Sequence, residues 1–218
     1  MSKRKAFLFD LNGTMIDDMQ YHIHAWHRIL NELGANISLE RMKEECYGKN
    51  EELLERMFPG RFTAEEKHNM SMEKERQYQA GFKPNLVLLP GLDEFLKTAH
   101  TSGIKMAIGS AAIMFNIDFV LDNLDIRYCF DAIVSADDVK NSKPDPETYL
   151  SCAEKLQCDP IDCIVFEDSP KGVDSALRAG MKAVVITTLH EPHEFAEYSN
   201  VLMCVKDYTD PRLGELLK

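Results

Sequence analysis

The chain has 218 residues, of which 44% are hydrophobic and 28% charged, a composition typical of folded globular proteins and not of disordered ones. Its 36 acidic residues against 25 lysines and arginines give a formal net charge of −11. Such a surface repels the phosphates of nucleic acids, so we expect no nucleic-acid partner. The first apolar run covers only residues 6–9, and no run approaches the roughly 18 residues that span a membrane. We therefore expect a cytoplasmic protein that acts as a monomer, without membrane contact.

Short apolar segments along the chain have the length and composition of buried parallel strands. They are residues 6–9, 105–108, 132–134, 163–166, 183–186 and 202–205. Most of the segments between them have apolar residues at helical spacing, such as Leu92, Phe95 and Leu96. This alternation of strand and helix predicts an α/β fold with a Rossmann-like, doubly wound parallel sheet.

The alternation is interrupted once, after the first strand. From about residue 16 to residue 83 we find only helical patterns, for example the apolar stripe formed by Ile23, Trp26 and Leu30. An all-helical block at this position predicts a second, smaller domain inserted into the first. We expect an α/β core domain at residues 1–15 and 84–218, and a helical cap domain at residues 16–83.

Polar segments follow four of the predicted strands. In chain order they are residues 10–14 (DLNGT), 109–111 (GSA), 142–146 (SKPDP) and 167–170 (EDSP). Singly, each has an ordinary explanation: Asn-Gly favours a turn, Ser110 is a suitable helix N-cap, and an acidic pair suits a helix start. Lys143 alone is typical of a solvated loop. The carboxyl ends of parallel strands meet at one edge of a sheet, so we expect these side chains to converge there.

The four segments, in this order and combined with a helical insertion, resemble the haloacid dehalogenase superfamily. Within it they resemble the β-phosphoglucomutase-like branch of phosphatases and mutases with a helical cap. FLFDLNGT resembles the first family motif, IGSA the second, SKPDP the third and FEDSPKG the fourth, so the resemblance covers essentially the whole chain. It implies a Mg²⁺-dependent phosphohydrolase that acts on a small phosphorylated metabolite, with a sugar phosphate as one candidate.

The resemblance also implies a nucleophile and a metal site. Asp10 is the expected nucleophile, which attacks phosphorus and forms an aspartyl-phosphate. Mg²⁺ is expected on the carboxylate of Asp10, the backbone carbonyl of Asn12 and the carboxylate of Asp168. Glu167 is expected either as a further ligand or as a hydrogen-bonding partner of the ligands.

The same resemblance assigns residues to the phosphate and to the rest of the substrate. Lys143 is expected to neutralise both the nucleophile and the phosphoryl oxygens, and Ser110 with the backbone of Ala111 to bind those oxygens. In the cap, His22 and Lys49 are the expected substrate contacts.

Position 12 departs from the family pattern, which has Asp where this chain has Asn12. That aspartate exchanges protons with the leaving group and the attacking water, help that is worth roughly 10²–10⁴ in rate and that an amide cannot give. Three explanations stay open: an engineered variant, a leaving group that needs no proton, or another proton source. His22 and His24 are the candidates for the last, although most lone helix histidines pack or face solvent.

The predicted cap departs from the family in the segment Cys46–Glu51. β-Phosphoglucomutase-like caps have an arginine about where this chain has Glu51, and that arginine holds a second phosphate of the substrate; Lys49 is the possible replacement. A carboxylate repels a second phosphate, so the segment favours a monophosphate.

Alternative functions follow from these departures. A β-phosphoglucomutase-type isomerase is disfavoured by both of them, and a slow or inactive phosphometabolite-binding protein is kept open by Asn12. A haloacid dehalogenase proper is disfavoured because its chemistry needs no metal and leaves the pair Glu167 and Asp168 unexplained.

Overall fold

A computed structural model of the chain describes residues 5–218, so residues 1–4 of the expected core domain lie outside the described part. The chain divides into two compact units. One contains the chain up to Asp17 and from Val87 to Lys218, and the other contains Asp18–Leu86. We call them the core unit and the helical unit. The domain limits expected from the sequence, with residues 16–83 as the insertion, stay a prediction beside these units.

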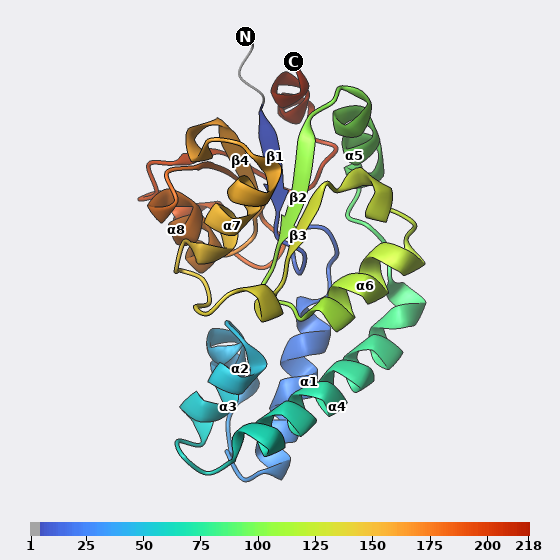
Figure 1. Cartoon of the computed structure of the whole chain (residues 1–218). Coiled ribbons are helices and arrows are strands. Elements are labelled where there is room, and N and C mark those ends of the chain that lie inside the picture. Colours follow the sequence, from blue (N-terminus) through green and yellow to red (C-terminus); the bar gives the residue numbers. More distant parts are fainter. Residues whose placement is uncertain (1–4) are drawn as a thin grey trace. The chain divides into compact units, whose positions relative to one another are not determined.

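The core unit contains a sheet of six parallel strands in the order β3-β2-β1-β4-β5-β6 (Figure 1). The strands are β1 (Ala6–Phe9), β2 (Lys105–Gly109), β3 (Ala132–Val134), β4 (Cys163–Glu167), β5 (Lys182–Ile186) and β6 (Val201–Val205). This is the strand order of a doubly wound, Rossmann-like sheet. The predicted α/β fold is therefore confirmed, and each of the six predicted strands is present with its ends shifted by at most one residue.

Helices cover the sheet and connect its strands. In the core unit they are α5 (Leu92–Thr101), α6 (Met114–Asn123), α7 (Glu147–Leu156) and α8 (Pro170–Arg178). Short 3₁₀ helices lie at Lys83–Asn85 (η1), Arg127–Cys129 (η2), Ala136–Asp138 (η3), Pro160–Asp162 (η4), Pro192–Phe195 (η5) and Pro211–Leu217 (η6), of which η1 belongs to the helical unit. No helix among residues 5–218 combines the length and the apolar character that a membrane crossing requires.

The two faces of the sheet have different cores because side chains alternate along each strand. On one face Ala6 and Leu8 of β1 pack in an aliphatic cluster with Leu156 of α7 and Val173 of α8. On the other face aromatic rings meet: Phe9 stacks on Phe166 with ring centroids 4.6 Å apart. Buried side chains therefore pack on both faces of the sheet.

The helical unit is made of α1 (Met19–Glu32), α2 (Leu39–Glu45), α3 (Asn50–Met57) and α4 (Ala64–Phe82). Residues 18–86, all of which are described, contain no strand, which confirms the predicted all-helical insertion after the first strand. The predicted stripe of Ile23, Trp26 and Leu30 lies in the core of this unit, where it packs with Leu53 and Leu54 of α3.

Candidate active site

The register of the sheet brings the ends of β1, β2 and β4 together. Phe9 is paired with Ile108 of β2 and with Phe166 of β4, so Asp10 lies beside Gly109 and Glu167. The backbone N–H of Asp10 extends this pairing, because it donates to the carbonyl of Phe166 at 3.0 Å. Carboxylate oxygens of Asp10, Glu167 and Asp168 consequently lie within 4.8 Å of one another, and all three residues are buried. The convergence expected for strand ends thus occurs for these acids.

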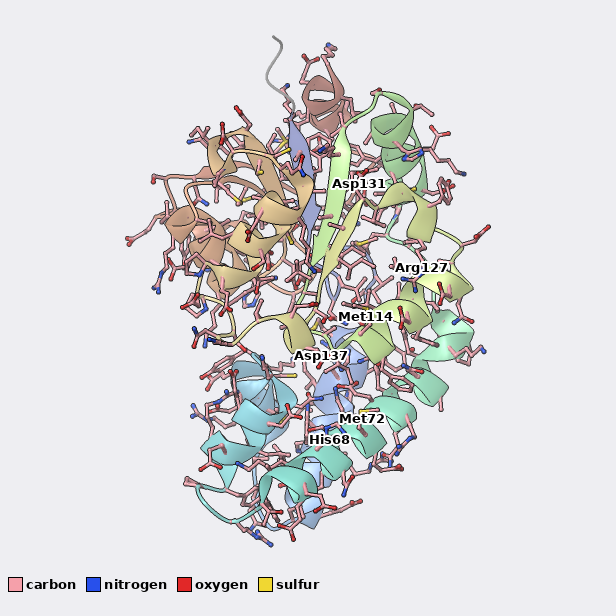
Figure 2. All side chains as sticks on the ribbon, in the orientation of Figure 1. His68, Met72, Met114, Arg127, Asp131 and Asp137 are labelled. Carbon is pink, nitrogen blue, oxygen red and sulfur yellow. The ribbon has the colours of Figure 1, made fainter. Side chains whose placement is uncertain are left out.

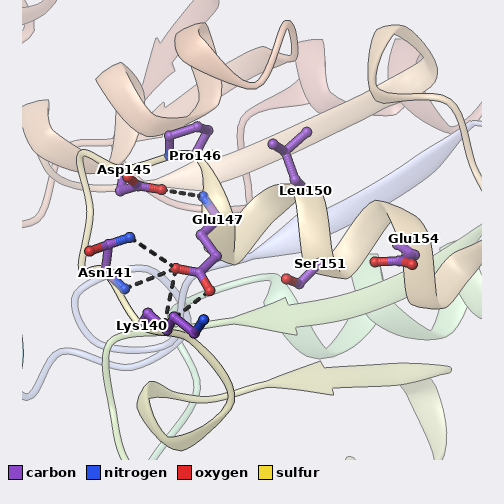
Figure 3. A pocket seen from close by; sticks show the side chains of 8 residues that line it. All are labelled: Lys140, Asn141, Asp145, Pro146, Glu147, Leu150, Ser151 and Glu154. Atoms are coloured by element: carbon purple, nitrogen blue, oxygen red, sulfur yellow. Dashed lines mark hydrogen bonds between the residues drawn. The ribbon is translucent and has the colours of Figure 1, made fainter.

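Lys143 reaches the acids from the loop between β3 and α7. Glu147, in the first turn of α7, holds this loop: its carboxylate accepts from the backbone N–H of Lys140 at 3.0 Å and of Asn141 at 2.9 Å (Figure 3). Figure 3 also shows the surface depression beside these residues, whose lining contains none of the three acids. We therefore regard the depression as the outer side of the loop and not as the reaction centre.

The ammonium group of Lys143 is enclosed by oxygen atoms. Its Nζ donates to Oδ1 of Asp10 and Oε1 of Glu167, both at 2.7 Å, to the hydroxyl of Tyr149 at 2.8 Å and to the carbonyl of Gly109 at 3.0 Å. Burial alone would lower the pKa of Lys143, but the charges of Asp10 and Glu167 outweigh it and raise this pKa above its ordinary value. The site therefore contains a permanent positive charge in contact with Asp10.

Glu167 is held by donors on both of its oxygens. Oε1 accepts from Lys143 and from the hydroxyl of Tyr149, the latter at 2.8 Å. Oε2 accepts from the backbone N–H of Asp168 at 3.0 Å and from the N–H and hydroxyl of Ser169, both at 3.1 Å. A carboxylate offers about four lone-pair sites, and these donors fill them. Of the two roles expected for Glu167, the arrangement favours that of a partner over that of a direct metal ligand.

The surroundings of Asp168 disfavour its ionised form, whereas those of the neighbouring Glu167 favour the ionised form. Its burial, followed by the charges of Glu167 and Asp10, raises the pKa of Asp168 well above its ordinary value. The pKa of Glu167 is lowered, because Lys143 and its hydrogen bonds outweigh the effect of burial. The three carboxylates of the cluster are accompanied by only the one ammonium group of Lys143, so their negative charge is not fully compensated. As a result the ionised form of Asp168 is disfavoured. A bound cation is the natural compensation for such a site.

Two glycines lie so close to Glu167 and Asp168 that only the absence of a side chain leaves room for the two carboxylates. A Cβ atom at Gly13, whose φ is +72°, would come within 2.1 Å of Oδ2 of Asp168. A Cβ atom at Gly172, in the first turn of α8, would come within 1.8 Å of Oε1 of Glu167. Any larger residue at either position would displace a carboxylate of the cluster.

Ser110 and Ala111 follow β2 at the same edge of the sheet. Ser110 is buried, its N–H donates to the carbonyl of Val134 at 3.0 Å, and its hydroxyl accepts from the N–H of Ala112 at 3.1 Å. Ser110 is not the N-cap of the following helix: α6 begins at Met114, whose N–H donates to Asp137 at 3.0 Å. Met114 and Asp137 are labelled close together in Figure 2.

Asn12 lies in the loop that follows β1 and is partly exposed. Its backbone forms an isolated bridge with Ile16, and the N–H of the next residue, Gly13, donates to the carbonyl of Ile16 at 2.9 Å. The loop from Asp10 to Ile16 is thus folded back on itself directly beside the acidic cluster.

The comparison with known families identifies this chain. The family model for haloacid dehalogenase-like hydrolases matches residues 7–186, a range that includes all four polar segments of the strand ends. The chain belongs to the haloacid dehalogenase-like hydrolases. The resemblance and the enzyme class predicted from the four motifs are therefore confirmed.

Individual hydrolases of this family are similar to the chain over most of its length. The β-phosphoglucomutase of Bacillus subtilis (strain 168) is 35% identical over 189 residues, which cover 83% of this chain and 82% of that protein. The fructose-1-phosphate phosphatase of Escherichia coli (strain K12) is 30% identical over 184 residues, 84% of this chain and 97% of that protein. A crystal structure of a family IA hydrolase, variant 3, from Entamoeba histolytica has a TM-score of 0.86 at 25% identity and covers 98% of this chain and 97% of its own.

The helical unit of this hydrolase contains a buried polar cluster around His22. Nζ of Lys74 lies 2.6 Å from Nδ1 of His22, and Nε2 of His22 lies 3.3 Å from Oδ2 of Asp18. Both ring nitrogens of His22 therefore have a polar neighbour within the unit. The ring also stacks on Tyr78.

The other cap residues named from the sequence lie elsewhere in the helical unit. His24 is exposed, and Lys49 immediately precedes α3, with its backbone N–H donating to Glu52 at 3.0 Å.

Two polar residues of this hydrolase were missed by the sequence analysis. Tyr149 lies in α7 and its ring is buried in the aliphatic cluster, while its hydroxyl contacts both Lys143 and Glu167. Lys74 lies in α4, which has no clear apolar stripe, and 52 residues separate it from His22. The spacing of Tyr149, six residues after Lys143, is the one signal that could have suggested the first contact.

Proposed function

We propose that this hydrolase is a Mg²⁺-dependent phosphatase that acts through an aspartyl-phosphate on a small phosphorylated metabolite, with sugar phosphates as the first candidates. The observation that carries the proposal is the position of the Lys143 ammonium, 2.7 Å from both Asp10 and Glu167, at the edge of an acidic cluster. A nucleophilic carboxylate, a fixed cation and further carboxylates for a metal are the groups that phosphoryl transfer to an aspartate needs. The relatives named for sugar phosphates support this choice of substrate.

The acidic cluster suits Mg²⁺ because its donors are hard oxygen atoms that lack compensating charge. Asp10, Asp168 and the backbone carbonyl of Asn12 would hold the ion, and Glu167, saturated by its own donors, would orient the neighbouring groups. Bound there, the ion supplies positive charge that lets an anionic phosphate approach a carboxylate.

In the proposed reaction a carboxylate oxygen of Asp10 attacks phosphorus. The bond between phosphorus and the leaving oxygen breaks, and that oxygen takes up a proton or leaves as an anion. Water then attacks the phosphorus of the aspartyl-phosphate, and the bond between phosphorus and the Asp10 oxygen breaks. This restores the Asp10 carboxylate and releases inorganic phosphate, and one proton of the water passes to the phosphate or to solvent. Lys143 keeps its charge throughout and neutralises the phosphoryl oxygens, while Ser110 and the N–H of Ala111 donate to them.

Asn12 restricts the proposed substrates. The amide cannot donate or accept the proton that an aspartate would transfer, which is worth roughly 10²–10⁴ in rate. Phosphates with stable leaving groups, such as acyl phosphates, should therefore react faster than phosphates of simple alcohols.

The remaining features of the proposal come from the sequence. His22 and Lys49 are proposed as substrate contacts of a cap domain at residues 16–83. The reacting groups are proposed to belong to a core domain at residues 1–15 and 84–218. We propose a monophosphate as substrate because Glu51 disfavours a second phosphate. A cytoplasmic, monomeric protein is proposed on the grounds given for the sequence.

The test is phosphate release from a panel of esters and anhydrides in Mg²⁺ and in EDTA. The panel contains hexose 1-phosphates, hexose 6-phosphates, hexitol phosphates, p-nitrophenyl phosphate and acetyl phosphate. We expect Mg²⁺-dependent release from at least one class, abolished in Asp10→Asn, which removes the nucleophile at nearly constant size. If neither the unaltered protein nor Asn12→Asp releases phosphate from any compound, the phosphatase proposal is wrong.

The same panel separates the two alternatives. Conversion of β-glucose 1-phosphate to glucose 6-phosphate would promote a β-phosphoglucomutase, for which the 35% identical relative is the supporting observation. Binding of phosphate esters without turnover in the unaltered protein, with turnover gained in Asn12→Asp, would establish a slow or inactive phosphometabolite-binding protein.

A further inference from the structure

Two hydroxyl groups from the C-terminal part of the chain donate to consecutive carbonyls of the loop after β1. Oγ1 of Thr188 donates to the carbonyl of Gly13 at 2.6 Å, across 175 positions of sequence. The hydroxyl of Tyr208 donates to the carbonyl of Thr14 at 3.1 Å, across 194 positions. All four residues belong to the core unit. Neither donor belongs to the four polar segments that follow the strands, and the reaction described above uses neither of them.

The hydroxyl of Tyr208 is held in place by its surroundings. The ring is 5% exposed and packs on Phe9, Phe95 and Phe166, with centroids 5.6–6.5 Å away. Its backbone N–H donates to the carbonyl of Pro90 at 2.9 Å. The next residue, Gly91, has φ of +79°, and a Cβ there would come within 2.7 Å of the Tyr208 backbone. Because burial raises the pKa of Tyr208 well above its ordinary value, the phenol keeps its proton and remains a donor.

Thr188 approaches the loop from the end of β5, which β4 separates from β1 in the sheet. It follows β5 by two residues, and its backbone N–H donates to the carbonyl of Ile186 at 3.1 Å. The preceding residue, Thr187, makes a different contact: its hydroxyl donates to the carbonyl of Val205 at 3.3 Å, within the sheet. Two adjacent threonines thus provide one hydroxyl for the loop and one for the sheet.

The position of the loop matters to the acidic cluster through two contacts. The loop begins at Asp10, and Asp168 lies against Gly13 so closely that no Cβ would fit between them. Inside the loop, the N–H groups of Gly13 and Met15 donate to the carbonyls of Ile16 and Leu11, both at 2.9 Å. The direction of two consecutive peptide planes is then fixed by the hydroxyls of Thr188 and Tyr208. These planes directly follow Gly13, the residue that lies against the carboxylate of Asp168.

We propose that Thr188 and Tyr208 are positioning residues for phosphoryl transfer: their hydroxyls fix the loop that carries Asp10 and the Asn12 carbonyl. The inference rests on the proposed function and deepens it. Neither residue acts on the substrate directly. Their contribution is to keep the nucleophile and the loop carbonyl in one arrangement before the phosphate arrives, which reduces the reorganisation that the reaction requires.

The test uses Thr188→Val, Tyr208→Phe and the double variant, each of which removes a hydroxyl at nearly constant volume. Three quantities are measured: kcat and KM for the best substrate, calorimetric affinity for beryllium fluoride in Mg²⁺ as a phosphoryl mimic, and hydrogen exchange of a peptide spanning residues 10–16. We expect each single variant to lower kcat and the beryllium fluoride affinity about 3- to 10-fold, the range of one hydrogen bond, with KM within about twofold. Exchange of the peptide should be faster in the metal-free variants.

Matched variants separate positioning from a general loss of stability. Thr187→Val removes the neighbouring hydroxyl, which donates within the sheet, and Tyr198→Phe removes a phenol that packs on Phe195 away from the loop. Both should keep the unaltered kcat and affinity, even if their melting temperatures fall. Thr188→Ser keeps the donor and should restore the values lost in Thr188→Val.

The inference is wrong if Thr188→Val and Tyr208→Phe retain unaltered kcat, affinity and exchange, or if Thr187→Val and Tyr198→Phe show the same losses. Failure of the proposed function itself would give a separate result, which differs from failure of the positioning role. If neither the unaltered protein nor Asn12→Asp releases phosphate from any compound of the panel, the phosphatase proposal is overturned, and the positioning role falls with it.

Discussion

Nζ of Lys143 lies 2.7 Å from Oδ1 of Asp10, although 133 residues separate the two in the sequence. The side chain of Lys143 is 8% exposed and that of Asp10 is 10% exposed, so water screens their charges only weakly. The lysine therefore stabilises the ionised form of the proposed nucleophile and holds it in one orientation.

Replacing Lys143 should remove most of the activity. Lys143→Met keeps the length of the side chain but leaves three carboxylates without a fixed cation, so we expect kcat to fall about 10²–10³-fold. The protein should also lose about 3–5 kcal/mol of stability, the cost of breaking a buried pair. Steady-state kinetics and urea unfolding measure the two effects. Lys155→Met is the matched control, because the side chain of Lys155 is 44% exposed; it should change kcat and stability little. Equal losses in Lys143→Met and Lys155→Met would contradict the prediction.

Converting Asn12 to aspartate should increase the rate in a way that depends on the leaving group. Asn12→Asp restores a group that can transfer a proton, so kcat for hexose 6-phosphates should rise about 10²–10⁴-fold. Acetyl phosphate, whose leaving group needs no proton, should gain much less. Comparing kcat across the phosphate panel measures this difference. A gain of the same size for every substrate would indicate a change in the metal site instead, and Asn12→Ala should match the unaltered protein.

The hydroxyl of Tyr149 should affect stability and activity through its hydrogen bonds to Lys143 and Glu167 and not through packing. Tyr149→Phe keeps the buried ring but removes the donor to Glu167 and an acceptor for Lys143. We expect a loss of about 1–3 kcal/mol in unfolding free energy, the cost of a missing buried hydrogen bond to a charged group, and a fall in kcat of about 10-fold. Chemical denaturation and kinetics test both. Tyr128→Phe, at a tyrosine that is 54% exposed, should leave them unchanged.

Gly172 should not tolerate even one added methyl group. In Gly172→Ala the new Cβ would lie 1.8 Å from Oε1 of Glu167, so the carboxylate must leave its donors. We expect activity to be nearly lost, even though alanine is the better helix former by about 1 kcal/mol. Gly81→Ala, in α4, has no atom within 4 Å of the new Cβ and should gain that stability without loss of activity. If Gly172→Ala is fully active, the described position of Glu167 is wrong.

Stabilisation by Mg²⁺ should increase with pH. Burial, with the charges of Glu167 and Asp10, raises the pKa of Asp168 above the value of about 3.9 in the unfolded chain. At pH values between the pKa of Asp168 in the unfolded chain and its higher pKa in the native chain, the native chain binds more protons than the unfolded chain. The metal-free protein therefore loses stability as the pH rises through this range. Mg²⁺ replaces that proton and removes the penalty.

Melting temperatures with and without Mg²⁺ at several pH values test this prediction. At a concentration of 100 times its dissociation constant, the ion should add about 2.7 kcal/mol. For a fixed Mg²⁺ concentration the gain should increase as the pH rises through the native pKa of Asp168. An equal shift at every pH would mean that no protonated carboxylate has to be displaced. The variant Asp168→Asn should show little Mg²⁺-dependent shift.

Local patterns in the sequence were sufficient to predict the fold and the acidic residues that meet at the strand ends. Apolar runs such as residues 6–9 and 163–166 form strands because they are short, apolar and flanked by helical spacing. Asp10 and Asp168 directly follow β1 and β4, and Glu167 ends β4, so strand ends alone predicted that these acids meet at one edge of the sheet. Lys143 lies beyond the end of β3 and its contact with Asp10 is set by the tertiary structure. The catalytic roles of these residues stay a prediction. The interrupted alternation in the same way indicated the helical insertion.

The sequence by itself determined the elements, their order in the chain and which polar residues follow the strands, since these depend on neighbours only a few positions apart. The tertiary structure decided which atoms meet: Tyr149 with Glu167, Lys74 with His22, and the hydroxyls of Thr188 and Tyr208 with the loop after β1. Each of these contacts joins residues that are 18 to 194 positions apart. A hydrogen bond requires its two atoms to lie within about 3 Å, a condition that the packing of the whole sheet or helix bundle sets and that no local pattern encodes.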